Sequence, residues 1–282
     1  MKFKNLFIVS LLLLSLGLVA CSGGDEKSIT VVSREDGSGT RSAFVELAGV
    51  LKKDDQGKTD QTTEEAIIQM QTEGVIQTVS KDDLAIGYIS TGSMSDRVKA
   101  LDIDGFSPSQ ENIRSGDYKI SRPFLLVTKE KNPLIEDFMS FIMSPAGQEI
   151  IGQDYIPLDP VGDYEPHDLA GKITIAGSTS VAPLMEKLTE AYSQINSQVS
   201  FEIQQPGSSA GIASALDATV DIGMSSRELT DDEASKLERQ VIAIDGIAVI
   251  VNKNNSLDTI SLDQLRKVFI GEILDWKELG GK

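Results

Sequence analysis

The sequence predicts an α/β fold in two domains, and three observations support this prediction. The chain has 282 residues, whereas single domains cluster around roughly 100 to 150 residues. Short apolar runs of strand length alternate with longer stretches in which apolar residues recur at helical spacing, a pattern typical of α/β proteins. A strand, a turn rich in glycine and serine, and a helix follow one another three times along the chain. The sequence therefore indicates repeated use of one structural unit.

The first of these units begins near the N-terminus. Residues 29–33 (ITVVS) are predicted to form a short buried strand, and residues 34–40 (REDGSGT) a turn. The helix that follows should begin at Gly39 and Thr40, because small and polar residues are common where helices start. Its apolar residues recur at helical spacing and are Phe44, Leu47 and Leu51.

The second and third units lie in the second half of the chain. Residues 173–176 (ITIA) form the predicted strand of the second unit, and residues 177–180 (GSTS) form its turn. In the third unit, strand residues 199–203 (VSFEI) lead to turn residues 207–209 (GSS). Both helices carry an apolar face. The residues of these faces are Val181, Leu184, Met185, Leu188 and Tyr192 in one, and Ile212, Ala215 and Leu216 in the other.

Four further segments complete the predicted fold. Residues 64–79 are expected to form a helix, and residues 84–90 (LAIGYIS) a strand. Residues 133–151 should form one or two helices, broken at the proline and glycine of residues 145–147. Residues 159–171 (DPVGDYEPHDLAG) are rich in proline, glycine and acidic residues, which predicts a linker.

The composition excludes several classes of partner and cofactor. The formal net charge of −17 argues against nucleic acid, which requires basic protein surface. One cysteine and one histidine cannot build a zinc site, and no acidic run has the spacing of an EF-hand. We therefore expect no metal and no cofactor. For an anionic ligand, the overall negative field would oppose approach, so binding would depend on local donors.

Residues 1–20 have the pattern of a secretory signal peptide. Lysines precede an apolar run, residues 6–14, that is too short to span a bilayer. Residues 18–21 (LVAC) resemble the lipobox of bacterial lipoproteins, in which cleavage leaves a lipid-modified cysteine at the N-terminus. The resemblance implies lipidation at Cys21, a tether over residues 21–28, and a lipid-anchored location at the extracellular face of the cell membrane. The alternative is an ordinary secretory signal followed by a free cysteine.

The three Gly/Ser turns have the chemistry of an anion site. The start of a helix presents backbone N–H groups without intrahelical partners and carries a partial positive charge. Hydroxyl groups add neutral donors, and glycine permits close approach. Any one such turn is more often a plain helix cap, but three of them beside an arginine favour an oxyanion site. Arg34 is the expected charged member, because a guanidinium meets two oxygens at once, and Asp36 is expected to hold it in place.

Two enzyme interpretations fit the sequence poorly. Residues 207–211 (GSSAG) match the G-x-S-x-G nucleophile elbow, which would make Ser209 a hydrolase nucleophile. The one histidine, His167, precedes Ser209 and is expected to be a solvated linker residue, whereas that triad runs serine, acid, histidine. Residues 37–41 (GSGTR) lack the G-K-[ST] ending of a nucleotide phosphate loop. We therefore expect a binding protein rather than an enzyme.

Seven segments together resemble one family of transport proteins. They are residues 33–40 (SREDGSGT), 85–90 (AIGYIS), 155–157 (YIP), 176–183 (AGSTSVAP), 206–211 (PGSSAG), 220–227 (VDIGMSSR) and 269–276 (FIGEILDW). Each is weak alone, but the set is specific and extends over nearly the whole chain after the signal. It resembles the phosphate-binding receptor lipoproteins of bacterial phosphate ABC transporters, the PstS family. The resemblance implies a type II periplasmic-binding-protein-like fold, in which two α/β lobes close over a ligand.

The order of these segments differs from the order usual in the family. Family members begin with the segment like residues 173–183, and they place the arginine motif after the segment like residues 269–276. Joining residue 282 to residue 28 would restore that order, so the chain is expected to be a circular permutant, similar to streptococcal members. Permutation succeeds where old termini lie close together and new ones fall in exposed segments. Residues 159–171 would be the new junction.

The resemblance also implies how the chain divides into lobes. The family's two crossing segments are expected near residues 119–123 and 243–248. One lobe would then comprise residues 29–120 and 246–282, and the other residues 121–245. The first lobe would carry the arginine motif, and the second would carry the other two Gly/Ser turns.

The ligand contacts implied by the resemblance come from both lobes. This sequence departs from the family at Ser226, where many relatives have an aspartate that accepts the phosphate proton, and at Ser180, where some have an aromatic residue. A buried acceptor beside the ligand rejects fully ionised sulfate, because lone pairs would face each other. Asp36 or a serine oxygen would accept the proton here. The expected ligand-binding residues are Arg34, Ser38, Gly39, Thr40, Thr179, Ser180, Ser208 and Ser226.

The expected function is capture of inorganic phosphate outside the cell and its delivery to the permease and ATPase subunits of an ABC importer. We expect the receptor to be a monomer. One alternative is a receptor for another tetrahedral oxyanion, either sulfate or a phosphonate. The other is a secreted serine hydrolase.

Overall fold

The computed structural model describes residues 28–54, 57–130 and 132–280. The predicted signal peptide, Cys21 and all of the tether except Ser28 lie outside the described residues. Within the described part of the chain, no helix is both long and apolar enough to cross a bilayer.

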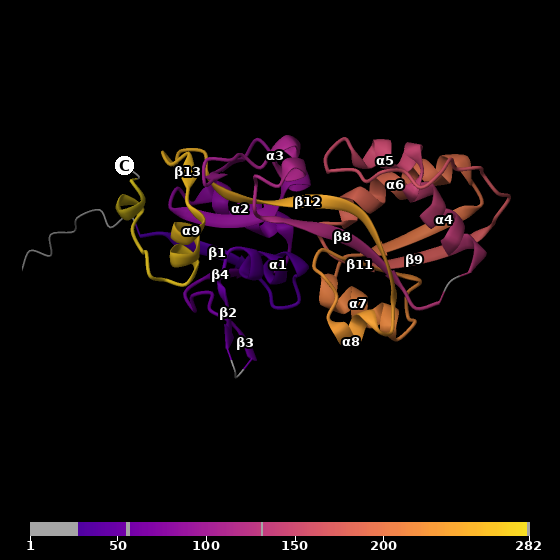
Figure 1. The fold of residues 1–282 in the computed structure, drawn as a ribbon, viewed down its shortest axis with the longest axis horizontal. Helices are drawn as coiled ribbons and strands as arrows, with labels where there is room; N and C mark the ends of the chain where they lie inside the picture. The colour runs from indigo at the N-terminus through magenta and orange to yellow at the C-terminus, as the bar shows by residue number, and fades with distance from the viewer. Residues whose placement is uncertain (1–27, 55–56, 131, 281–282) are drawn as a thin grey trace, which may run out of the picture.

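One long strand runs through both halves of the molecule. β12 (Glu238–Asn252) pairs antiparallel with β8 (Ser121–Thr128) over its first part and with β5 (Ala85–Ser90) over its second. Figure 1 shows β12 and β8 passing between two lobes. The left lobe is built mainly from residues 28–120 and 246–280, and the right lobe mainly from residues 121–245. The register places Arg122 opposite Asp245. The nine-stranded sheet has the order β10 (Val199–Gln204), β9 (Gly171–Gly177), β11 (Ile222–Ser225), β8, β12, β5, β1 (Thr30–Arg34) and β4 (Ile67–Gln69), with β6 (Val98–Ala100) also paired to β12.

The left lobe contains two strand–turn–helix units side by side. β1 (Thr30–Arg34) lies between β5 and β4 (Ile67–Gln69) and pairs in parallel with both. α1 (Gly39–Leu47) follows β1, and α2 (Thr72–Lys81) follows β4. Because the strands are parallel, the turns that open both helices lie at the same edge of the sheet.

Aromatic packing fixes α1 against this sheet. The rings of Phe44 on α1 and Tyr88 on β5 are stacked with centroids 4.0 Å apart, and Phe269 lies 4.6 Å from Phe44. All three side chains are buried, and each aromatic ring that leaves water contributes substantially to such a core. The helix that follows the turn is therefore held against the sheet.

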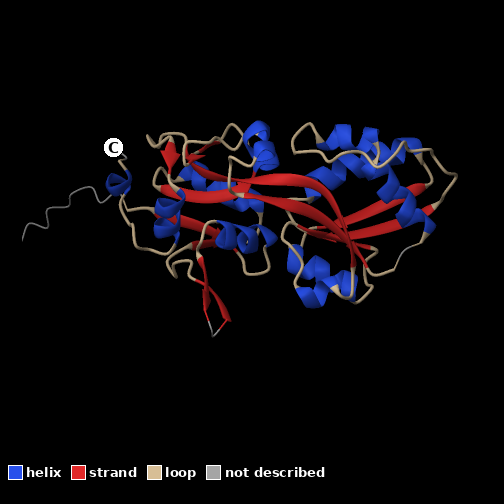
Figure 2. Ribbon diagram, in the orientation of Figure 1, coloured by secondary structure: helices blue, strands red, loops and turns tan. Residues whose placement is uncertain are grey.

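The left lobe also carries several short elements. Figure 2 shows that the hairpin of β2 and β3 projects from it. These elements are β2 (Leu51–Asp54), β3 (Gly57–Asp60), β6 (Val98–Ala100), β7 (Asp102–Ile103), β13 (Thr259–Ile260), α3 (Gln110–Ser115), α9 (Leu262–Phe269), η1 (Thr91–Ser93) and η2 (Trp276–Leu279).

The right lobe repeats the same construction. β9 (Gly171–Gly177) pairs in parallel with β10 and with β11 (Ile222–Ser225). β8 pairs antiparallel with β11 on one side and with β12 on the other. α6 (Ala182–Ile195) follows β9, and α7 (Ser208–Leu216) follows β10. The two helix-opening turns therefore lie together at one edge. The remaining elements are β10 (Val199–Gln204), α4 (Pro133–Met143), α5 (Pro145–Ile151) and α8 (Asp231–Ala234).

Each lobe has its own main hydrophobic core. One large buried cluster joins residues between 29 and 120 to residues between 247 and 279, with Ile156 added. The other large cluster lies between residues 124 and 243. The predicted division into lobes at residues 120/121 and 245/246 is compatible with these two cores. Residues 159–170 contain neither helix nor strand, as the predicted linker 159–171 requires, but Gly171 is already the first residue of β9.

All three predicted strand–turn–helix units are present, but two details of the secondary structure are wrong. The segment 64–79, expected to be one helix, contains strand β4 and then the start of α2. Pairing with β1 overrides the helical preference of this segment. Leu51, expected on the first helix, lies on β2, because α1 ends at Leu47 and Gly49 turns the chain with φ 71°.

A candidate anion site between the lobes

Four helix-opening turns meet where the two lobes face each other. The turns before α1 and α2 belong to the left lobe, and those before α6 and α7 to the right lobe. The Ser209 N–H donates to Gly37 O at 3.2 Å, which joins a turn of one lobe to a turn of the other. The hydroxyls of Thr40 and Ser180 are 2.9 Å apart and make a second such link. Helix starts supply N–H donors and partial positive charge, so this junction is suited to an anion.

Arg34 lies at the centre of this junction. It is the last residue of β1, and its side chain is only 2% exposed. Tyr88 holds its backbone, because the Arg34 N–H donates to Tyr88 Oη at 3.2 Å. Burial raises the pKa of Tyr88 to about 12, so its hydroxyl stays protonated. The Tyr88 ring packs against α1, and its hydroxyl therefore also positions the backbone of Arg34.

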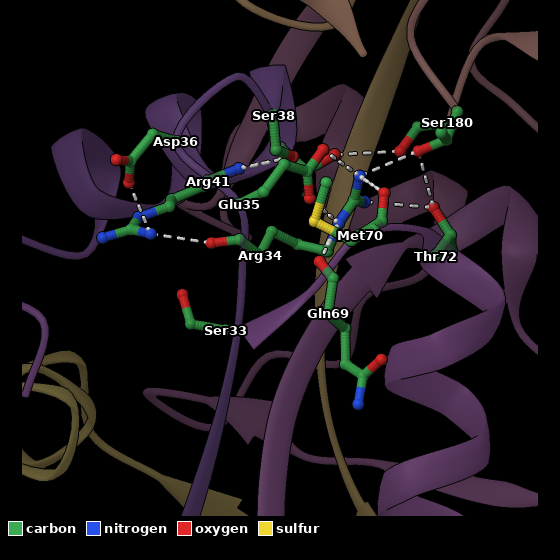
Figure 3. A network of polar contacts seen from close by, with 12 residues as sticks. Ser33, Arg34, Glu35, Asp36, Ser38, Arg41, Gln69, Met70, Thr72 and Ser180 are labelled. Carbon is green, nitrogen blue, oxygen red and sulfur yellow. Dashed lines mark hydrogen bonds and ion pairs between the residues drawn. The ribbon is translucent and has the colours of Figure 1, made fainter. Parts of the chain in front are cut away.

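The guanidinium of Arg34 contacts parts of both lobes (Figure 3). Its Nε and Nη2 atoms donate to the two oxygens of Glu35, both at 2.9 Å. Nη2 also donates to Thr179 Oγ1 at 3.1 Å, across the lobe junction. Nη1 donates to Thr72 Oγ1 at 3.3 Å, and the Thr72 and Thr179 hydroxyls are 3.2 Å apart. The carbonyls of Gln69 and Met70 accept the remaining contacts.

A cluster of serine hydroxyls lies on the right-lobe side of the junction. Ser178 Oγ donates to Ser226 Oγ at 2.9 Å, and the Ser226 N–H donates to Ser208 Oγ at 3.2 Å. These three side chains are buried, as is Ser180. A Cβ on Gly39 would stand 2.3 Å from Ser208 Oγ, so only glycine permits this approach of the left-lobe turn. Small hydroxyl donors and one glycine thus bring the two lobes into direct contact.

Two grooves between the lobes flank this junction. One, of about 340 Å³, is lined by Thr72 and Thr179, the two hydroxyls that contact Arg34. The other, of about 840 Å³, is lined by Arg41 and Arg227. Ser38 caps α1 by accepting from the Arg41 N–H.

The structure corrects the expected role of Asp36. Its carboxylate pairs with Arg41 at 2.8 Å rather than with Arg34, and its side chain is 94% exposed. Arg41 in turn donates to the Arg34 carbonyl at 2.8 Å and pairs with Asp60. The turn directs the two neighbouring carboxylates to opposite sides, and Glu35 takes the contact that was expected for Asp36.

Sequence reasoning missed three side chains of this junction, Glu35, Thr72 and Ser178. Glu35 lies in the first Gly/Ser turn, and its position next to Arg34 in the sequence is the signal that could have identified it. Thr72 could not be identified, because the sequence predicts one helix over residues 64–79 and so no turn before Thr72. The other predicted residues are buried and lie in or beside the four turns. They are Arg34, Ser38, Gly39, Thr40, Thr179, Ser180, Ser208 and Ser226.

His167 and Ser209 lie in different surroundings. His167 Nδ1 is 2.5 Å from Asp137 Oδ1, although its side chain is 67% exposed. Asp137 also accepts from Tyr192 and Tyr164. The linker is thus docked on the right lobe, and the histidine is not simply solvated. Ser209 Oγ instead accepts from Arg227 at 3.5 Å. Among the described residues, no group of three or more His, Cys, Asp or Glu side chains is arranged to hold a metal ion.

A comparison with models of protein families identifies the superfamily of this chain. The family whose model matches this chain is described as the PBP superfamily domain, and the match covers residues 16–146 and 164–282. The chain belongs to this superfamily, in agreement with the two-lobed α/β fold. The predicted periplasmic-binding-protein-like fold is confirmed; the predicted circular permutation stays a prediction.

Closer relatives define the particular family. "Phosphate-binding protein PstS 2" of Streptococcus agalactiae is 46% identical over 99% of this chain and 98% of its own length. The Streptococcus pneumoniae protein of the same name is 43% identical over 99% of this chain and all of its own. A crystal structure of a phosphate ABC transporter's phosphate-binding protein from Streptococcus pneumoniae has a TM-score of 0.72 at 45% identity, covering 89% of this chain and 99% of that chain. This chain belongs to the same family as these PstS 2 proteins, which confirms the resemblance.

Proposed function

We propose that this chain is an extracellular receptor that binds inorganic phosphate between its lobes and delivers it to an ABC importer. The observation that carries the proposal is the buried guanidinium of Arg34, which contacts helix-opening turns of both lobes. A positive charge surrounded by hydroxyls and helix starts suits a small tetrahedral oxyanion. The names of the relatives, phosphate-binding proteins rather than enzymes, support both the ligand and the transport role.

In this proposal each lobe contributes part of the ligand's coordination. Arg34, with the turn Ser38, Gly39 and Thr40, binds from the left lobe. Thr179, Ser180, Ser208 and Ser226 bind from the right lobe with hydroxyl or backbone N–H donors. Among the described residues, every buried side-chain nitrogen or oxygen has a hydrogen-bond partner. An anion that replaced such contacts would bridge the lobes and favour the closed arrangement.

The location and the partners follow from the same proposal. Lipidation at Cys21 would hold the receptor at the extracellular face of the cell membrane, where the permease and ATPase subunits of an importer receive the ligand. The receptor would act as a monomer. Replacing Cys21 with serine should release the protein into the culture medium, and retention at the membrane would contradict the anchor.

One contact supports the proposed circular permutation. Ser28 forms a β-bridge with Asp275, and the Ile29 N–H donates to Leu274 O at 2.7 Å. The first described residues therefore lie beside a segment close to the end of the described chain. Short joins between neighbouring ends are what permutation requires.

Calorimetry with phosphate, sulfate and an alkylphosphonate tests the ligand. The proposal predicts strong binding of phosphate and much weaker binding of the other two. Equal affinity for phosphate and sulfate would contradict selectivity and favour a general oxyanion receptor. Absence of binding by any of the three would contradict an oxyanion receptor altogether.

A further inference from the structure

The crossing of β8 and β12 contacts the proposed anion site through one arginine. The side chain of Arg122 on β8 is only 2% exposed, and its Nη1 atom donates to the backbone oxygen of Ser226 at 3.1 Å. The Nη2 and Nε atoms of the same guanidinium donate to Asp245 on β12 at 3.0 and 3.2 Å. A residue outside the proposed set of ligand contacts therefore bonds directly to a member of that set.

The main chain of Ser226 is held on two sides. Its N–H donates to Ser208 Oγ at 3.2 Å, at the turn that opens α7, and its carbonyl accepts from Arg122. Ser226 is fully buried, so this carbonyl depends on a protein donor rather than on water. The Ser226 hydroxyl accepts from Ser178 Oγ at 2.9 Å. The contact with Arg122 thus helps to fix the place from which this hydroxyl meets the junction.

Asp245 connects the same network to the left lobe. Its carboxylate is fully buried and accepts from Ser90 Oγ at 2.7 Å and from Thr91 Oγ1 at 3.1 Å. Ser90 is the last residue of β5, and Thr91 is the first of η1. Hydrogen bonds therefore lead from the left lobe, through the strands that pass between the lobes (Figure 1), to Ser226 in the right lobe.

The charge of Arg122 is already matched within the protein. All three nitrogens of its guanidinium have protein partners, and two of them share the Asp245 carboxylate. Burial lowers the pKa of Arg122, the positive charge of Arg34 adds to this effect, and the Asp245 charge opposes it. Arg122 is therefore suited to orienting its neighbours rather than to supplying a second cation for the ligand.

We propose that Arg122 is a positioning residue for anion binding, which holds Ser226 in place from the strand crossing. This inference rests on the proposed function. A donor whose backbone is already fixed loses less conformational freedom when the ligand binds, so the ordering cost of binding is smaller. Asp245 fixes the direction of the guanidinium, and Arg122 acts through Ser226 without touching the anion.

A double variant, Arg122→Met with Asp245→Asn, tests this role. It removes the donor to Ser226 without leaving a buried charge unpaired. Calorimetry would measure the phosphate dissociation constant, and urea denaturation would establish that the variant is folded. We expect the dissociation constant to rise about tenfold, the scale of one hydrogen bond to a charged group. Arg122→Lys keeps a charge beside Asp245 but loses the planar fork of donors, and it should weaken phosphate binding in the same direction.

A thermodynamic cycle with Ser226→Ala measures whether Arg122 acts through Ser226. If it does, the double variant should weaken phosphate binding by less than about threefold when residue 226 is already alanine, because no hydroxyl remains to be positioned. A loss that stays about tenfold in the Ser226→Ala background would overturn the inference. This comparison separates positioning from a general loss of stability, which would act equally in both backgrounds.

Tyr118→Phe is the control for damage to β12. The buried Tyr118 hydroxyl donates to Ile247 O on this strand at 2.7 Å. The variant should leave phosphate affinity within about twofold of the parent. A loss equal to that of the double variant would overturn the inference, as would unchanged affinity in the folded double variant or in folded Arg122→Lys. Failure of the parent protein to bind phosphate would instead overturn the proposed function.

Discussion

Two arginines of this protein are equally buried but lie in different surroundings. The side chains of Arg34 and Arg122 are each 2% exposed, and each pairs with a carboxylate. Arg122 pairs with Asp245 directly across β8 and β12, where the strands pass between the lobes. Arg34 contacts turns and hydroxyls at the lobe junction. The difference lies in the partners: those of Arg122 belong mainly to the central strands, and those of Arg34 to turns of separate lobes.

The Arg122 pair is built as a structural unit. Asp245 is fully buried and also accepts from Ser90 at 2.7 Å and Thr91 at 3.1 Å. Burial raises the pKa of the Asp245 carboxyl, while the Arg122 charge and these hydroxyls oppose the rise. Arg122 Nη1 donates to the backbone oxygen of Ser226 at 3.1 Å, so this arginine also contacts the serine cluster. Buried charge by itself therefore does not identify a ligand site.

The largest effect on stability is expected at the strand crossing. Arg122→Met leaves Asp245 buried without its counter-charge and should lower the free energy of unfolding by roughly 3 to 5 kcal/mol. Urea denaturation would measure this loss. Adding Asp245→Asn should restore much of it, because the unpaired charge is then removed. Full stability of the single variant would show that the pair is dispensable.

The largest effect on binding is expected at Arg34. Arg34→Ala should weaken phosphate binding by roughly 2 to 5 kcal/mol if the ligand is desolvated in the closed site. Calorimetry would measure the change. Arg239→Ala is the control, since Arg239 is an exposed arginine paired with Glu228 on the right lobe. Unchanged affinity in Arg34→Ala would make Arg34 a structural residue like Arg122.

A smaller effect is expected at Thr72, a hydroxyl that sequence reasoning missed. Thr72→Val removes the contacts to Arg34 and Thr179 without changing the shape of the side chain. Phosphate affinity should fall by about 0.5 to 1.5 kcal/mol, the net contribution of one neutral hydrogen bond. Thr78→Val on the same helix is the control, because its hydroxyl bonds to Gly74 and Gln69 instead. Equal losses of phosphate affinity in both variants would show that the Thr72 hydroxyl has no specific role in binding.

The smallest effect is expected at the ion pair of a third arginine, Arg227, with Glu233. Its hydrogen bonds lower the pKa of Glu233 to about 2 from the ordinary 4.5. A carboxyl whose pKa is lowered by folding stabilises the protein above its ordinary pKa, and this contribution is lost as the pH falls from 4.5 toward 2. Glu233→Gln should therefore lower the melting temperature slightly near neutral pH, with the difference shrinking toward pH 2. A difference that is constant with pH would contradict this assignment.

The periodic parts of the fold could be predicted from the sequence. Apolar spacing on α6 and α7, and the Gly/Ser turns before them, are local signals that the sequence carries directly. β4 could not be found in this way, because Ile67 and Ile68 form a strand only by pairing with β1 at the sheet edge. That pairing created the turn at Thr72, so one error of secondary structure hid one residue of the site.

Side-chain direction could not be predicted either. Glu35 and Asp36 are adjacent carboxylates in one turn, and the composition of the turn does not say which of them faces Arg34. The backbone of the turn decides, and it places Asp36 in solvent. The contact between His167 and Asp137 joins a linker to a helix 30 residues earlier in the chain, a distance at which sequence spacing gives no signal.

A crystal structure of the protein grown with phosphate and without sulfate would test the account most directly. The account predicts tetrahedral density at the lobe junction, with oxygens within hydrogen-bond distance of Arg34, the turn at Ser38–Thr40, and the turns at Thr179 and Ser208. Saturating phosphate that leaves no density there, or density bound only at another surface, would contradict it.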